Sequence, residues 1–138
     1  MSAVSLLIGS ALMCFGALLS ALSASPELQE AWFAKLCSIL SKPGPLDDVR
    51  CPLVQSVSGR VLELGPGAGA NFRCLANATG ITEYSTVEPN DKFTPALLAE
   101  AEKQSLPFPL TPTWLKGEDL DVDAASFDSV LATHVLVS

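Results

Sequence analysis

A glycine-rich loop between an apolar strand and a helix is the part of the sequence whose residue types and spacing most clearly predict chemistry. Residues 59–72 are GRVLELGPGAGANF, with Gly65, Gly67 and Gly69 at alternate positions. Glycine lets a backbone turn tightly and approach a ligand because no Cβ intervenes, and the helix that follows offers free N–H groups at its positive end. The stretch therefore predicts a site for a nucleotide-like ligand.

The glycine spacing alone does not distinguish NAD from other adenosine cofactors. Gly65, Gly67 and Ala70 also satisfy the G-x-G-x-x-G/A pattern of dinucleotide-binding folds. Glu63 argues against NAD, because dinucleotide folds carry an apolar residue at this position. A carboxylate near the end of a buried strand is costly to desolvate unless something pairs with it.

A second acid, Glu88, ends the next predicted strand, residues 83–88, and lies 19 residues beyond Gly69. A carboxylate at this place in a nucleotide-binding α/β fold accepts hydrogen bonds from both ribose hydroxyls, in NAD and in other adenosine cofactors alike. Glu88 therefore indicates an adenosine cofactor without identifying which one. A turn acid before Pro89 is the structural alternative.

Residues 61–69, VLELGPGAG, resemble motif I of the class I methyltransferases, a Rossmann-like α/β family that uses S-adenosylmethionine. In that family, the acid and the glycine loop serve the methionine end of the cofactor, whose ammonium group suits a carboxylate. The resemblance implies that S-adenosylmethionine is the cofactor. The cofactor-binding residues implied in these two stretches are Glu63, Gly65, Pro66, Gly67, Gly69, Asn71, Glu88, Pro89 and Asn90.

The resemblance extends to the turn after a third predicted strand, residues 113–116. Gly117, Glu118 and Asp119 follow that strand, and in the family an acidic side chain there meets the amino group of adenine. Alignment on Glu-Asp-Leu puts the usual acid at Lys116, so Glu118 and Asp119 are both candidates. A charged surface turn is the structural alternative.

Residues 126–136, SFDSVLATHVL, resemble the strand that carries motif IV, the fourth strand of the family's sheet. Thr133 and His134 fall where family members line the methyl-transfer site, so both are candidate catalytic residues. The ordinary pKa of histidine, about 6.5, suits a base or a group that orients the substrate. A structural histidine at a strand end is the alternative reading of His134.

Several features together resemble the methyltransferase-like protein seven family: an uncharged N-terminus, LELGPGAGANF, Glu-Pro-Asn at 88–90, Gly-Glu-Asp at 117–119 and T-x-V-L-x-S at 133–138. These proteins are similar to ubiquinone-biosynthesis methyltransferases, lie on endoplasmic reticulum and lipid-droplet membranes, and are implicated in S-methylation of small thiols. The resemblance implies a small, apolar methyl acceptor, with a thiol favoured over a quinone precursor or a lipid.

The resemblance covers residues 59–138, whereas a complete class I methyltransferase has a seven-stranded sheet. We therefore expect the N-terminal half of the fold, with about four parallel strands. A truncated, inactive module that binds cofactor or acts as a decoy is one alternative to an active methyltransferase. An NAD(P)-dependent oxidoreductase is the other.

The N-terminal segment predicts membrane attachment. No charged side chain precedes Glu27, and a helix over residues 3–24 is about 33 Å long, against about 30 Å of hydrocarbon. We expect residues 1–25 to be a membrane anchor; a cleaved signal peptide is the alternative, although the basic start of such peptides is missing. Lys35 and Lys42, which follow the segment, favour the cytosolic side for the rest of the chain.

Residues 26–58 are expected to form an amphipathic helix, ending near Leu40, and then a linker over residues 43–58 that leads to a partial methyltransferase domain at 59–138. The helix carries an apolar stripe that lies either in a membrane interface or against the following domain. Its members are Leu28, Trp32, Leu36 and Ile39.

Charge and cysteine content argue against nucleic-acid-binding, zinc-binding and disulfide-rich proteins. The formal charge of −7 among 138 residues, without a Lys/Arg cluster, makes nucleic acid an unexpected partner. The four cysteines form no CxxC pair, so we expect reduced, structural thiols and neither a zinc site nor a disulfide framework. The sequence predicts no oligomeric state.

Overall fold

The computed structural model describes residues 16–17, 20–21 and 23–133. The chain divides into two compact units, Met1–Phe33 and Ala34–Ser138. Most of the expected anchor, residues 1–25, lies outside the described residues. Within the described part, no helix combines the length and apolar character needed to cross a bilayer.

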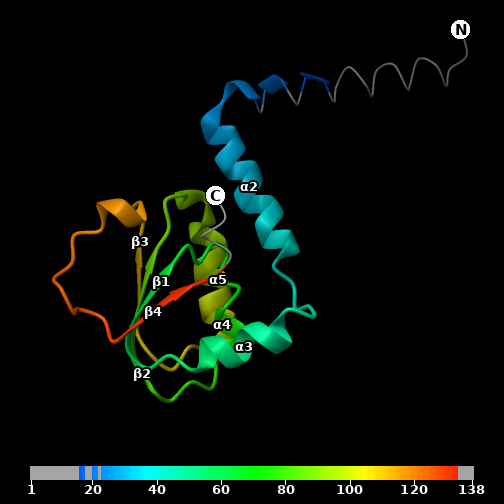
Figure 1. Ribbon diagram of the computed structural model, residues 1–138. Coiled ribbons are helices and arrows are strands. Elements are labelled where there is room, and N and C mark those ends of the chain that lie inside the picture. Colours follow the sequence, from blue (N-terminus) through cyan, green and yellow to red (C-terminus); the bar gives the residue numbers. More distant parts are fainter. Residues whose placement is uncertain (1–15, 18–19, 22, 134–138) are drawn as a thin grey trace, which may run out of the picture. The chain divides into compact units, whose positions relative to one another are not determined.

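The unit Ala34–Ser138 is an α/β structure built on a four-stranded, all-parallel sheet (Figure 1). The strand order is β3-β2-β1-β4. The chain steps outward from β1 to β3 and then returns to the other side of β1, as in Rossmann-like folds. This confirms the expected parallel sheet of about four strands. The strands are β1 (Gly59–Leu64), β2 (Ile81–Val87), β3 (Leu110–Thr113) and β4 (Ser129–Ala132).

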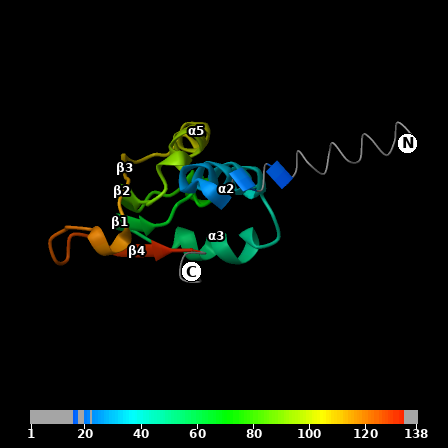
Figure 2. The ribbon, with the colours of Figure 1, turned by 90° about the horizontal axis from the view of Figure 1, so that it is seen from above.

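Helices α3 (Asp47–Gln55), α4 (Phe72–Leu75) and α5 (Thr94–Gln104) lie against the same face of the sheet (Figures 1 and 2). The 3-10 turn η1 (Asp91–Phe93) leads into α5. Fully buried side chains fill the space between these helices and the sheet. They include Phe72, Leu75, Tyr84 and Leu97.

Two predicted boundaries are wrong. The expected linker over 43–58 contains α3, whose acidic first turn favours a helix start despite Pro52, and whose buried Val54 packs into the core. The third strand begins and ends earlier than predicted, because Pro112 lies within β3 instead of before it. Proline is tolerated there since β3 is an edge strand.

The expectation of reduced thiols is wrong for two cysteines. Cys51 of α3 and Cys74 of α4 form a disulfide, with their Cα atoms 5.0 Å apart. The two residues are 23 positions apart in the sequence, and only the packing of α3 beside α4 brings them together. Cys37, in α2 (Pro26–Leu40), is a free thiol.

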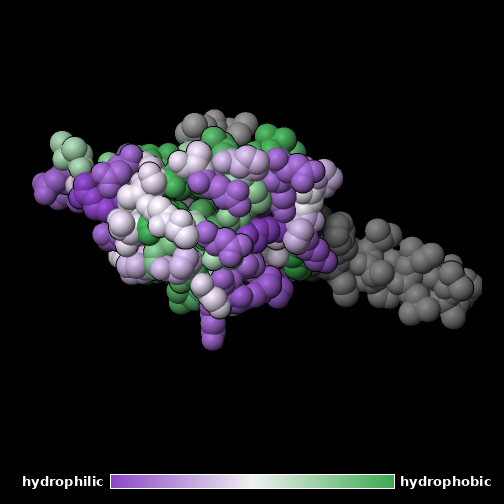
Figure 3. All heavy atoms as spheres, turned by 90° about the horizontal axis from the view of Figure 1, so that it is seen from below, coloured by the Kyte–Doolittle hydropathy of each residue, from purple (hydrophilic) through white to green (hydrophobic). Residues whose placement is uncertain are grey.

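Helix α2 has the predicted bounds, but its apolar stripe is exposed. Leu28 and Trp32 in the first unit, and Leu36 and Ile39 in the second, are all between 44% and 51% exposed. Within the second unit, Cys37 and the buried Ala34 pack beside Ala68 and Phe93. The view from below in Figure 3 shows mostly hydrophilic side chains, interrupted by scattered hydrophobic ones.

Candidate functional site

The carboxyl ends of parallel strands share one edge of the sheet, and the predicted site residues meet there. Glu63 lies at the end of β1, Thr133 directly follows β4, and Glu88 directly follows β2. The strand order reverses between β1 and β4. In open α/β sheets, ligands bind outside the carboxyl ends of the strands at such a reversal.

Glu63 is almost fully buried, with 1% of its surface exposed. The Tyr84 hydroxyl donates a hydrogen bond to its Oε2 at 2.8 Å, and Asn71 Nδ2 donates to its Oε1 at 2.6 Å. Burial raises the pKa of Glu63 to about 7, although these two hydrogen bonds and the charge of Arg50 oppose the rise. The carboxyl group is therefore able to gain or lose a proton near neutral pH.

Asn71 connects the ends of β1 and β4. Its Nδ2 donates to Thr133 Oγ1 at 2.9 Å as well as to Glu63. Its Oδ1 is buried, and no donor among the described residues reaches it. Asn71, Thr133 and Glu63, three predicted site residues from separate parts of the sequence, thus form one hydrogen-bonded cluster. His134 lies outside the described residues.

Glu88 ties the glycine loop to the end of β2. Its Oε2 accepts from the Gly67 backbone N–H at 3.1 Å, and its Oε1 accepts from that of Asn90 at 3.0 Å. Burial raises the pKa of Glu88, while these two hydrogen bonds lower it. Each carboxylate oxygen keeps a further lone pair for another donor. Pro89, also predicted to touch the ligand, is exposed.

The loop itself depends on left-handed backbone conformations. Gly65, Gly67 and Gly69 have φ values of 64°, 54° and 78°. The Gly65 N–H donates to the Val87 carbonyl at 2.8 Å, which fixes the loop to β2. Pro66 is buried within the loop. The predicted strand, glycine loop and helix therefore occur in that order, with a short helix α4.

Replacing Gly69 with alanine is expected to destabilise the protein by about 2–4 kcal/mol, through a disfavoured φ and overpacking. A Cβ at Gly69 would lie 2.8 Å from the Phe72 ring, which is fully buried. Chemical denaturation of both proteins measures the change. Gly117→Ala is the control, because a Cβ there meets nothing within 4 Å. Equal stability of the two variants would contradict the prediction.

The acidic turn after β3 is separate from this cluster. Gly117, Glu118 and Asp119 form the exposed 3-10 turn η2 (Gly117–Asp119). Among the residues that the structure describes, neither acid hydrogen-bonds to Glu63, to Glu88 or to the glycine loop. The structure thus does not bring these three predicted residues into contact with the others.

The sequence reasoning missed two contributors to the site. Tyr84 is two residues before Thr86, which pairs with Glu63 across the sheet, so strand alternation places Tyr84 on the same face as Glu63. This placement follows from the pairing register of the two strands, which the sequence alone does not give. Arg50 comes from α3, in the segment expected to be a linker, and no sequence signal marked it.

A cavity of about 240 Å³ lies beside the glycine loop but away from the Glu63 cluster. The last turns of α2, the loop and α5 line it with small side chains and one pair of charges. Ser38, Ala68, Ala70, Glu100 and Lys103 are among the lining residues. Lys103 and Glu100 pair with each other at 2.9 Å.

Comparison with known proteins identifies no relative: no protein-family model matches the chain, and no curated protein sequence matches it.

Proposed function

We propose that this chain binds S-adenosylmethionine at the carboxyl edge of its sheet and serves as the cofactor-binding half of a class I-type methyltransferase. The observation that carries the proposal is the buried Glu63 cluster at the end of β1. A carboxylate and the unpartnered Asn71 Oδ1 lie together at the reversal of strand order. A buried acceptor without a donor, beside a carboxylate, suits a bound ammonium group.

The residues present fit the rest of the cofactor. Glu88 has lone pairs left for the ribose hydroxyls, and the loop of glycines lets the backbone approach closely. Glu118 and Asp119 remain the candidates for adenine. The cofactor, when bound, supplies an activated methyl group on a sulfonium centre.

The work of the protein in such a reaction is positioning. Glu63 and Asn71 would hold the amino group, and Thr133 would border the methyl-transfer site. The methyl group and the acceptor atom would be kept in line and away from water. His134 is the candidate for orienting the acceptor or taking its proton. We propose a small, apolar acceptor, with a thiol favoured, reached from a membrane surface on the cytosolic side.

Calorimetric titration of the full chain, purified in mild detergent, with S-adenosylmethionine tests the proposal. Saturable binding, with no binding of NADH, is the expected result. Binding of NADH alone would overturn it in favour of an oxidoreductase. A small alkyl thiol is then added, and mass spectrometry of the methylated product tests methyl transfer.

A second candidate function is a cofactor-binding module that does not itself catalyse. The observation that favours it is the edge strand β4, where Val130 is 62% exposed. An open edge of this kind offers pairing to another chain. Saturable binding of S-adenosylmethionine without methylation of any thiol would favour this candidate.

A further inference from the structure

Arg50 is a largely buried cation with an unused donor. Its side chain is 13% exposed, and its Nη2 donates to Asp47 Oδ1 within α3. Its Nε–H is buried, and within the described part of the chain no acceptor reaches it. Buried donors of this kind normally have a partner, so the unused Nε–H calls for an explanation.

The surroundings of Arg50 indicate what the partner is. The positive charge of Arg50 lowers the pKa of Glu63, so the guanidinium lies within electrostatic reach of that carboxyl group. Asn71, hydrogen-bonded to Glu63, has the unpartnered acceptor Oδ1. The unused acceptor therefore belongs to a residue that hydrogen-bonds this carboxylate, and the unused donor belongs to a cation within its electrostatic reach.

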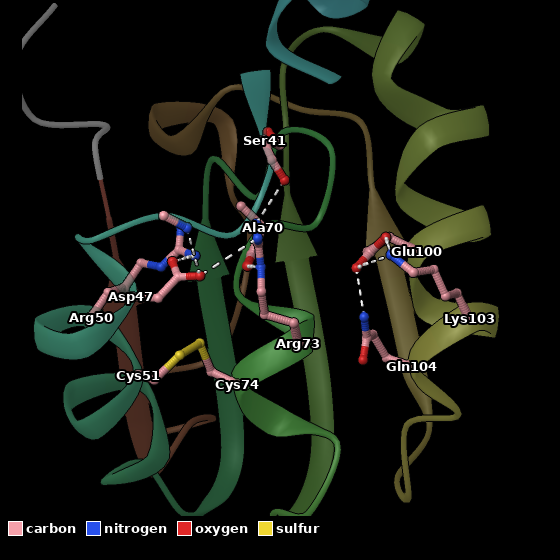
Figure 4. A network of polar contacts seen from close by, with 11 residues as sticks. Ser41, Asp47, Arg50, Cys51, Ala70, Arg73, Cys74, Glu100, Lys103 and Gln104 are labelled. Atoms are coloured by element: carbon pink, nitrogen blue, oxygen red, sulfur yellow. Dashed lines mark hydrogen bonds and ion pairs between the residues drawn. A yellow bond between two sulfur atoms is a disulfide. The ribbon is translucent and has the colours of Figure 1, made fainter. Parts of the chain in front are cut away.

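The neighbouring arginine is not available for the same task. Arg73 Nε donates to the Ala70 carbonyl at 3.0 Å, and its Nη2 donates to the Ser41 carbonyl at 2.8 Å (Figure 4). Its Nη1 lies 3.6 Å from Asp47 Oδ2. Arg73 thus joins the end of the glycine loop to the chain at Ser41 and Asp47, whereas Arg50 keeps an unused Nε–H.

We propose that Arg50 determines specificity for the amino-acid end of the ligand: its guanidinium pairs with the α-carboxylate, while Asn71 Oδ1 and Glu63 take the α-ammonium. The inference rests on the proposed function, which supplies a ligand with both groups. A guanidinium suits a carboxylate because it is planar, always charged and a multiple donor. Arg50 is a positioning residue and takes no part in bond making.

The test compares S-adenosylmethionine with its decarboxylated analogue, which keeps the sulfonium and the ammonium but lacks the carboxylate. The readout is the dissociation constant, measured by calorimetry on the full chain. The wild-type protein is expected to bind S-adenosylmethionine about 10- to 100-fold more tightly. In Arg50→Gln this preference is expected to fall to about 3-fold or less.

Controls separate this role from a structural one. Arg73→Gln is expected to weaken both ligands alike, because Arg73 holds the loop. Equal weakening of both ligands by Arg50→Gln would overturn the inference. Arg50→Lys keeps a charge beside Asp47 but lacks the Nε–H. It replaces Arg50→Gln in the test if the glutamine variant does not fold. An unchanged preference in Arg50→Lys would also overturn the inference.

Failure of the proposed function gives a different pattern. If the folded wild-type protein binds neither ligand, both the function and the role of Arg50 are wrong. If the wild-type protein binds both with equal affinity, the cofactor assignment stands and only the inference about Arg50 falls.

Discussion

Replacing Glu63 with glutamine is expected to raise the free energy of unfolding at pH 8 by about 3 kcal/mol. Burial raises the pKa of Glu63 from an ordinary 4.5 to about 7, and each unit of such a difference corresponds to about 1.4 kcal/mol. At pH 8 the folded protein therefore holds an unfavourable buried charge. Glutamine removes that charge and keeps the shape, since the Tyr84 hydroxyl can rotate to accept from its amide.

The pH dependence has a definite sign. The unfolded chain releases the Glu63 proton near pH 4.5, and the folded protein releases it near pH 7. Between these values the folded state binds more protons at Glu63. The contribution of Glu63 to the free energy of unfolding is therefore most favourable below about pH 4.5, falls as pH rises, and levels off above about pH 7. The stability difference between Glu63→Gln and the wild-type protein is therefore expected to grow over that range.

Urea denaturation of both proteins between pH 4.5 and 8 measures this difference, and contributions from the other acids cancel in it. Glu83→Gln, at an exposed position of β2, is the matched control and is expected to leave the difference near zero. A difference for Glu63→Gln that stays constant with pH would refute the raised pKa.

Ligand binding is expected to respond in the opposite direction. A bound ammonium group favours the charged form of Glu63, so wild-type affinity for S-adenosylmethionine rises with pH up to about 7 and then levels off. Glu63→Gln loses the charge that the ammonium needs. A residue that lowers stability while it serves a ligand is typical of a binding site.

The sequence predicted the parts of the site that depend on local chemistry. The glycine loop, Glu63 and Glu88 lie where strand and turn signals placed them, because left-handed glycines and a short apolar strand leave few alternatives. The contact of Tyr84 with Glu63 was not predicted, since it depends on the pairing register of β1 and β2.

The parts that could not be predicted depend on packing between distant segments. Residues 43–58 were predicted to be a linker, yet burial of Val54 and the contact with α4 favour helix α3 in this segment. The proximity of Cys51 and Cys74 exists only once α3 lies beside α4. Arg50 lies on the same helix as Cys51. Because α3 was not predicted, neither the disulfide nor the position of Arg50 near Glu63 could be predicted.

Reduction of the Cys51–Cys74 bond is expected to lower the free energy of unfolding by about 3 kcal/mol, because it frees a loop of 23 residues in the unfolded chain. The effect should reach the ligand site as well. Cys74 lies three residues after Asn71 on the segment that follows the glycine loop. After reduction, this segment would be held to the preceding chain by Arg73, through Asp47 and Ser41, and by the hydrogen bond from Gln55 Nε2 to the Cys74 carbonyl.

Thermal unfolding with and without a dithiol reductant measures the loss, and hydrogen exchange at residues 70–75 reports the local loosening. The Cys51→Ser/Cys74→Ser double variant is expected to be as stable as the reduced wild-type protein, and addition of the reductant should not change its stability. Cys37→Ser should respond as the wild-type protein does, since Cys37 is free. An unchanged unfolding temperature of the wild-type protein in reductant would contradict the prediction.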